Sequence, residues 1–129
     1  MSTVKKFEDL ECWKKSRDLC NKIFLLAQNS PFCNDYSLKD QILRSSGSVM
    51  DNIAEGYERG GNRELIQYLY IAKSSCGEVR SQLHRALDRS YLKQLEFDEL
   101  YSLAEEISRI IYGFINYLKN SEIKGQKFK

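Results

Sequence analysis

The chain has 129 residues, of which 42% are hydrophobic and 29% are charged, and its net charge is only +2. This length gives room for one domain with one core, and the near-neutral charge does not predict binding to polyanions through gross charge. The single proline argues against a loop-rich or all-β fold, which needs more turn residues. The sequence has no apolar run long enough to cross a bilayer and no apolar signal stretch at its N-terminus. We therefore expect a cytoplasmic protein without membrane contact.

The first predicted helix covers about residues 9–29. Its apolar positions at helical spacing are Leu10, Trp13, Cys20, Ile23, Phe24 and Ala27. Lys14, Lys15 and Lys22 fall on the other side, where Asp18 lies within ion-pairing distance along the helix. We interpret this basic cluster as a solvated face, with a nucleic-acid contact as the alternative. The helix should end before Pro31, because the residue that precedes a proline avoids the α region.

The second and third predicted helices form a hairpin. The second begins after Ser37, a favourable N-cap residue with Asp40 three positions later, and it stops at Gly60-Gly61. The third follows Asn62, which can serve as its N-cap. The expected core positions are Leu38, Ile42, Val49, Ile53 and Tyr57 on the second helix, and Leu65, Tyr68, Leu69, Ala72, Cys76, Val79, Leu83 and Ala86 on the third.

Small residues cluster in the middle of both helices of this hairpin, at residues 45–48 (Ser-Ser-Gly-Ser) and 74–77 (Ser-Ser-Cys-Gly). Ser46 precedes Gly60 by as many residues as Ser75 follows Gly61, so the two clusters should lie at the same height. Each helical glycine costs about 1 kcal/mol of propensity, which predicts a close helix–helix approach as compensation. By the same count Glu78 lies level with Arg44, and we expect Glu78 to pair with a cation, in this chain or in another subunit.

The fourth predicted helix covers about residues 94–120, after a loop over residues 88–93. Its expected core positions are Leu100, Leu103, Ile107, Ile111, Phe114 and Leu118. Short connections make consecutive helices antiparallel neighbours. The sequence therefore predicts an all-α, antiparallel up-down-up-down four-helix bundle over residues 1–120, followed by a mobile basic tail over residues 121–129.

Two helices carry a second apolar stripe beside the expected core stripe. On the second helix the stripe comprises Leu43, Gly47, Met50 and Ala54, and on the fourth it comprises Tyr101, Ala104, Tyr112 and Ile115. One bundle cannot bury both stripes, and soluble monomers rarely expose large apolar patches. We therefore predict a homo-oligomer, with two different patches meeting head to tail in a ring. The candidate interface residues are Leu43, Met50, Ala54, Tyr101, Tyr112 and Ile115. The alternative is that both stripes cover loops and tail of the same chain.

The sequence predicts no catalytic residue, metal, cofactor or small-molecule substrate. Its four cysteines form no C-x-x-C pair, and the single histidine, His84, is too little for a zinc or di-iron site. We expect reduced, mostly buried thiols. Acidic side chains cluster at the end of the second helix, and we interpret them as a solvated or inter-subunit polar face. An enzyme that uses the Glu55 and Glu78 carboxylates is the least favoured alternative.

Several strings together resemble a known family. The most specific is Asn52-Ile-Ala-Glu55-Gly56, in a context of Trp13, Pro31-Phe32, Gln41-Ile42, Ile71-Ala72 and Glu78. They resemble the bacterial four-helix-bundle protein family, whose members are also called ribosomal RNA intervening-sequence proteins. The resemblance implies a four-helix bundle that assembles as a homopentamer. It also implies kinship with the accessory proteins of diversity-generating retroelements, which bind a reverse transcriptase and nucleic acid. Those accessory proteins are strongly basic, whereas this chain is nearly neutral.

Two functional hypotheses follow. The first is a non-enzymatic homo-oligomeric scaffold or adaptor. The second is an accessory protein that binds RNA or DNA and partners a reverse transcriptase, with Lys14, Lys15, Lys22, Arg59, Arg63 and the lysine-rich tail as candidate contacts. Arg59 and Arg63 flank the Gly60-Gly61 turn, where no neighbouring helix should cover them, so we expect these two to matter most if nucleic acid is bound.

Overall fold

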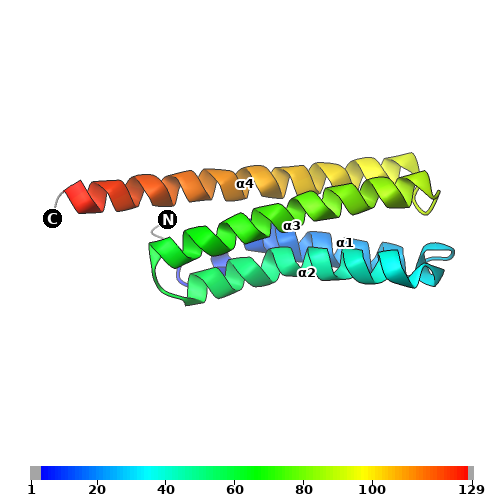
Figure 1. Cartoon of the computed structure of the whole chain (residues 1–129), viewed down its shortest axis with the longest axis horizontal. Helices are drawn as coiled ribbons and strands as arrows, with labels where there is room; N and C mark the ends of the chain where they lie inside the picture. The colour runs from blue at the N-terminus through cyan, green and yellow to red at the C-terminus, as the bar shows by residue number, and fades with distance from the viewer. Residues whose placement is uncertain (1–3, 128–129) are drawn as a thin grey trace.

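A computed structural model describes the backbone of residues 4–127 and the side chains of residues 4–121. The chain forms four long helices, α1 (Glu11–Ala27), α2 (Tyr36–Glu58), α3 (Asn62–Asp88) and α4 (Gln94–Lys127), and two short 3₁₀ turns, η1 (Phe7–Asp9) and η2 (Phe32–Asn34). Consecutive helices run in opposite directions and pack in the pairs α1–α2, α2–α3, α3–α4 and α1–α4 (Figure 1). This arrangement confirms the all-α, up-down-up-down four-helix bundle. Across the described residues, we find no helix that is both long and apolar enough to span a membrane.

The helix ends agree with the sequence prediction to within about two residues, except in three places. Asp35, rather than Ser37, caps α2, because its carboxylate accepts a hydrogen bond from the Leu38 amide at 3.2 Å. Asn62 is the first residue of α3 and makes no capping hydrogen bond, since Gly61 occupies the N-cap position in an extended conformation. Helix α4 continues to Lys127, past the expected end at residue 120. The predicted mobility of the tail over residues 121–129 falls mainly on residues whose side chains lie outside the described ones, and it stays a prediction.

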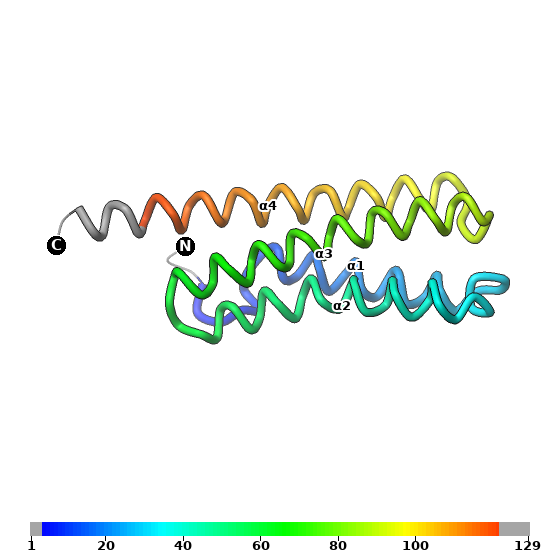
Figure 2. The backbone as a smooth tube through the Cα atoms, viewed as in Figure 1, coloured from blue at the N-terminus to red at the C-terminus, as the bar shows by residue number. Residues whose placement is uncertain are grey.

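The connections between the helices lie at the two ends of the bundle. Figure 2 shows the α1–α2 and α3–α4 connections together at one end and the α2–α3 connection at the other. The loop over residues 88–93 lies where the sequence predicted it, between Asp88 and Gln94.

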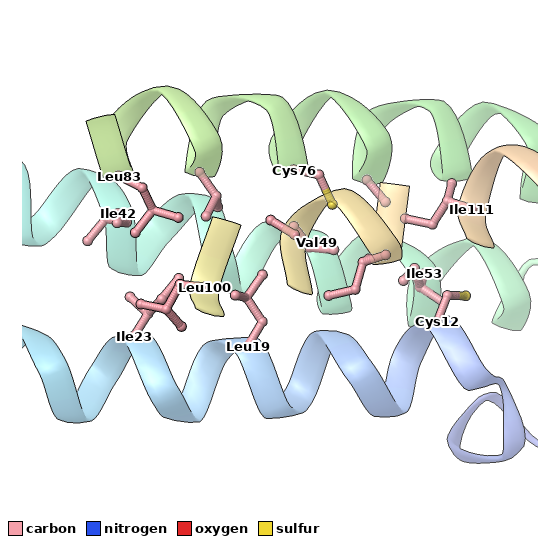
Figure 3. Close-up of a cluster of buried hydrophobic side chains, with 14 of the residues drawn as sticks. Cys12, Leu19, Ile23, Ile42, Val49, Ile53, Cys76, Leu83, Leu100 and Ile111 are labelled. Carbon is pink, nitrogen blue, oxygen red and sulfur yellow. The ribbon is translucent and has the colours of Figure 1, made fainter. Parts of the chain in front are cut away.

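The core is a column of aliphatic side chains with two buried thiols, Cys12 and Cys76 (Figure 3). The predicted core positions of α2 and α3 are buried, apart from the half-buried Tyr57 and Tyr68. On the first helix the predicted core positions Leu10, Ile23 and Ala27 are confirmed, whereas Trp13, Cys20 and Phe24 were assigned about one residue, or roughly 100° of rotation, away from the buried stripe. The buried positions are Leu10, Cys12, Ser16, Leu19, Ile23 and Ala27. Consequently Trp13 and Cys20 are only half-buried and Phe24 is 52% exposed.

On α4 the core stripe is centred differently from the predicted one. Ala104 and Ile115 are 0% exposed, while Leu103 and Phe114 are half-buried. Ala104 and Ile115 share one helix face with Ile107 and Ile111, because all four recur at spacings of three or four. The assignment of Ile115 to an oligomer interface was therefore wrong: its side chain belongs to the core of its own bundle.

Helices α2 and α3 meet through their small residues at the height that the sequence predicted. The Ser75 hydroxyl donates a hydrogen bond to the Ser48 hydroxyl at 2.9 Å. The glycines of these clusters do not cause the close approach, however, because a Cβ on Gly47 would meet no atom within 4 Å. Among the glycines of these two helices, Gly56 is the one without room for a side chain, because an added Cβ would lie 2.6 Å from the Cβ of Tyr68.

Candidate functional site

The string around Asn52 that carries the family resemblance forms part of the α2–α3 contact. The Asn52 side-chain amide donates to the Ser48 carbonyl at 2.8 Å and to the Ser48 hydroxyl at 2.9 Å. Because the Ser75 hydroxyl donates to the same Ser48 oxygen, a continuous hydrogen-bonded chain joins the two helices. Asn52 is half-buried and has its donor satisfied, so its role here is to hold α2 against α3.

One turn further along α2, Glu55 joins a cluster at the α2–α3 turn. The Arg59 guanidinium donates to Glu55 at 3.1 Å and to the Tyr68 hydroxyl at 2.7 Å, and it lies 5.2 Å from the Tyr68 ring centroid. The Tyr68 hydroxyl and the Arg59 guanidinium lower the pKa of Glu55 below its usual value. A carboxylate held ionised in this way is a poor general base at neutral pH. Gly56 lets Tyr68 lie over this turn, so Glu55 and Gly56 serve one structural arrangement.

Glu78 does not pair with Arg44 within the chain. Arg44 is paired with Asp40 at 3.1 Å, one turn away on its own helix. Glu78 is exposed on α3, and no side chain among residues 4–121 lies within ion-pair distance of it. The intrachain pairing was wrong because the local i,i+4 partner competes successfully for Arg44. A partner for Glu78 in another subunit stays a prediction.

A second polar cluster, which the sequence prediction missed, ties together the two connections at the other end of the bundle. One oxygen of Asp35 accepts hydrogen bonds from Arg89 and from the Tyr91 hydroxyl, each at 2.8 Å. The Tyr91 ring stacks on Phe32, with 5.1 Å between ring centroids. Asp35 therefore caps α2 and also anchors the α3–α4 loop. The position of Asp35, three residues before Leu38, could have identified it as the N-cap of α2 from the sequence. The local sequence does not indicate its contacts with Arg89 and Tyr91, which lie far away along the chain.

This cluster predicts an acid-sensitive element of stability. Hydrogen bonds from Tyr91, the Leu38 amide and Arg89 lower the folded-state pKa of Asp35 below its ordinary value, which is about 3.9 in the unfolded chain. The ionised carboxylate thus contributes stability above that pH, and the contribution is lost as the pH falls through the folded-state pKa. We expect Asp35→Asn to flatten this part of the pH dependence of the melting temperature. Asp88→Asn, at an exposed position nearby, is the control and should follow the wild-type curve; an unchanged acid profile in Asp35→Asn would contradict the assignment.

The structure does not gather the predicted nucleic-acid contacts into one patch. Lys15 pairs with Glu106 at 3.1 Å, and Lys22 pairs with Glu99 at 2.6 Å, so both link α1 to α4. Lys14 is exposed on the same helix. Arg59 contacts Glu55 and Tyr68. Arg63 follows the Gly60-Gly61 turn and is exposed in the first turn of α3. Lys15, Lys22 and Arg59 are therefore neutralised by neighbouring groups or serve helix packing.

Two adjacent helices carry apolar side chains that lie beside the fully buried core positions and remain partly exposed, and we call them the α1–α2 apolar face. The face comprises Trp13, Cys20 and Phe24 of α1 and Leu43, Met50 and Ala54 of α2. On both helices the three positions are spaced by seven and then four residues, which places them on one side. Cys20 forms a hydrogen bond with Ser46, one turn from Met50, so the two stripes adjoin. All six side chains are half-buried except Phe24, which is 52% exposed.

The groups that could act as nucleophiles or metal ligands have other roles. Burial raises the pKa of Cys12 and of Cys76 to about 12, so both thiols are protonated at neutral pH. The His84 ring packs against Phe97 and Tyr101, with centroids 4.9 and 5.4 Å away. Within the described residues, no three His, Cys, Asp or Glu side chains come together as a metal site would require.

The fold and its polar contacts define an all-helical bundle protein in which the motif around Asn52 serves helix packing. Comparison with known proteins gives the family: the sequence profile of the 23S rRNA-intervening sequence proteins matches residues 8–113. The chain belongs to this family, as the motif around Asn52 predicted. No curated protein matches the chain.

A solved structure supports the fold independently. The chain is similar to a protein of unknown function from the S23 ribosomal protein family of Bacteroides thetaiotaomicron, with a TM-score of 0.75 and 22% sequence identity. The match covers 81% of this chain and 95% of that chain. At this level of identity the similarity concerns the fold alone.

Proposed function

We propose that this protein is a non-enzymatic, homo-oligomeric scaffold or adaptor. The observation that carries the proposal is the α1–α2 apolar face, where six apolar side chains on two neighbouring helices remain partly exposed. Removing apolar surface from water is worth about 25 cal/mol per Å², so a second copy of the chain that covers this face would be stabilised. Five-fold closure is what the family resemblance implies, and it enters the proposal on that ground alone.

The polar side chains of the family motif support a structural role rather than catalysis. Asn52 is engaged by Ser48, and Glu55 by Arg59 and Tyr68. A residue that is satisfied by such contacts must break them before it can bind or activate a substrate. We therefore propose that the motif fixes the packing of α2 against α3. In this way it holds α2 in place, and α2 carries part of the α1–α2 apolar face.

Substituting Met50 with glutamate tests the proposed assembly. Met50 lies at the middle of the α2 stripe and is half-buried within its own chain. A carboxylate there can remain hydrated in the monomer, but it would lose its hydration in a covered interface. We expect the wild type to have a mass that is a multiple of 15.1 kDa, five times for a pentamer, and Met50→Glu to give a 15.1 kDa species with unchanged helical content. Light scattering coupled to gel filtration measures the mass.

A matched control separates loss of the interface from the addition of charge. Leu95 is 82% exposed on α4, away from the α1–α2 apolar face, and Leu95→Glu adds the same charge. This variant should retain the wild-type mass. A wild-type chain that stays at 15.1 kDa at micromolar concentration, or a Met50→Glu variant that keeps the wild-type mass, would overturn the assembly proposal.

The alternative proposal is an accessory protein that binds RNA or DNA beside a reverse transcriptase, and it rests on the family resemblance. Three of the cations that the sequence predicted as nucleic-acid contacts, Lys15, Lys22 and Arg59, are already paired with carboxylates. These ion pairs argue against nucleic-acid binding through those residues. Localisation to the cytoplasm remains a prediction from the sequence.

A further inference from the structure

A groove on the outer side of α3 and α4 carries cations that form no ion pair with the described residues. It has a volume of about 520 Å³ and is lined by Lys73 and Arg80 from α3 and by Ser108, Arg109 and Tyr112 from α4. The α3–α4 side lies across the bundle from the α1–α2 apolar face, as the helix positions in Figure 1 show. The groove is therefore separate from the α1–α2 apolar face, although it contains Tyr112, one of the interface candidates predicted from the sequence.

The three cations of the groove lack carboxylate partners. Among residues 4–121, Lys73, Arg80 and Arg109 make no ion pair, in contrast to Lys15 and Lys22 on the other side of α4. One acidic residue, Glu105, also lines the groove. Three positive charges against one negative charge leave the groove locally positive, although the whole chain is nearly neutral. Such a concave surface concentrates anions.

Exposed tyrosine rings alternate with these cations. Tyr112 is 53% exposed, and the Lys73 ammonium lies 5.9 Å from its ring centroid. Three residues before Lys73 on α3, Tyr70 is 42% exposed and accepts a hydrogen bond from Lys119 at 2.7 Å. On α3 the positions of Tyr70, Lys73 and Arg80 are spaced by three and seven residues, so they share one helix face. The face from Tyr70 to Arg80 is about 15 Å long at ~1.5 Å per residue.

We propose that this groove, defined by Lys73, Arg80, Arg109 and Tyr112, binds single-stranded nucleic acid. The cations contact backbone phosphates, and the exposed face of Tyr112 stacks against a base. A positive groove with accessible aromatic rings is the combination that binds single strands without strong sequence preference. A face of about 15 Å accommodates about four stacked nucleotides at a rise of ~3.4 Å. Duplexes are disfavoured, because their bases are not free to stack on a protein ring.

The test measures the binding of a fluorescein-labelled single-stranded RNA of about 12 nucleotides and mixed sequence by fluorescence anisotropy, starting from about 50 mM salt. The variant Lys73→Ala/Arg80→Ala/Arg109→Ala should bind at least about tenfold more weakly than the wild type. Each phosphate contact on a single strand contributes about 0.7 to the salt slope. We therefore expect the slope of log K against log salt to fall by about two.

Two further variants keep the test independent of folding defects. Glu105→Gln removes the one acid that lines the groove and should tighten binding, an effect that misfolding cannot imitate. Tyr112→Ala should weaken binding with little change in salt slope, whereas Tyr112→Phe, which keeps the ring, should bind like the wild type. The control Lys5→Ala/Lys39→Ala/Lys93→Ala removes the same total charge outside the groove and should have a much smaller effect.

The proposal is overturned if wild-type protein fails to bind the RNA at low salt, if binding is insensitive to salt, or if the control triple variant loses as much affinity as the groove variant. It is also overturned if the groove variant changes the oligomeric mass while the control does not, since the groove would then be a contact between copies of the chain. Light scattering on the same samples distinguishes this outcome. Loss of RNA binding with an intact assembly mass leaves the scaffold proposal unaffected.

Discussion

Replacing Ile115 with alanine should lower the free energy of unfolding by about 2–5 kcal/mol. Ile115 is 0% exposed in the core of the bundle, so truncation removes buried apolar contacts and leaves a cavity that the rigid helices can only partly close. Urea unfolding followed by circular dichroism measures the change. Ile115→Glu goes further, because an unpaired carboxylate in the core costs far more than a cavity, and we expect that variant not to fold.

The matched control is Ile71→Ala on α3. Ile71 is 48% exposed, and the same truncation there should change stability by no more than about 0.5 kcal/mol. Both variants are measured at two protein concentrations, because assembly contributes to apparent stability. If Ile115→Ala altered only the oligomeric mass and left stability unchanged, this side chain would lie in an interface after all, as the second apolar stripe of the sequence first suggested.

Replacing Gly56 with alanine should destabilise the protein by about 1–3 kcal/mol, the typical cost of overpacking. The new Cβ would stand 2.6 Å from the Cβ of Tyr68, where one of the two helix backbones must move. A shift of Tyr68 would also disturb its hydrogen bond with Arg59. Thermal and urea unfolding both measure the effect.

Gly47→Ala is the control for this substitution, on the same helix and with the same chemistry. A Cβ at Gly47 meets nothing within 4 Å, so the gain in helix propensity should stabilise the protein by about 0.5–1 kcal/mol. Opposite signs for the two glycines are the expected result. Stabilisation by both would show that the α2–α3 contact tolerates the extra methyl group.

These two glycines bear on how the family motif is understood. In Asn52-Ile-Ala-Glu55-Gly56, the isoleucine is in the core, the asparagine bridges to α3 through Ser48, and the glycine admits Tyr68. The glutamate holds Arg59 beside that tyrosine. The motif therefore describes how α2 and α3 fit together. Functional differences between relatives are then to be sought on outer surfaces such as the α1–α2 apolar face and the α3–α4 groove.

The sequence by itself determined the four helices, their order and the family. Helical periodicity is a local property, and the Gly60-Gly61 turn and Pro31 mark breaks that no tertiary contact is needed to recognise. Counting residues outward from the Gly60-Gly61 turn also predicted that the two serine clusters lie at the same height, because an antiparallel hairpin with a short turn has one register. The hydrogen bond between Ser48 and Ser75 confirms this prediction. The same count failed for Arg44 and Glu78, since side chains choose among several partners within reach.

Only the tertiary structure decided which apolar stripe of a helix faces inward. Helix α1 has two candidate stripes about 100° apart, one with Leu19 and one with Cys20, and α4 has a similar choice around Ile115. The neighbouring helices select the stripe that fills the bundle most completely, and the other becomes an outer face. The partners of charged side chains were likewise decided in three dimensions, because long-range proximity leaves no periodic trace in the sequence. Lys15 and Lys22 meet acids of α4, and Asp35 meets Arg89 and Tyr91. Within the part of the chain whose side chains are described, Lys73, Arg80 and Arg109 form no ion pair in their groove.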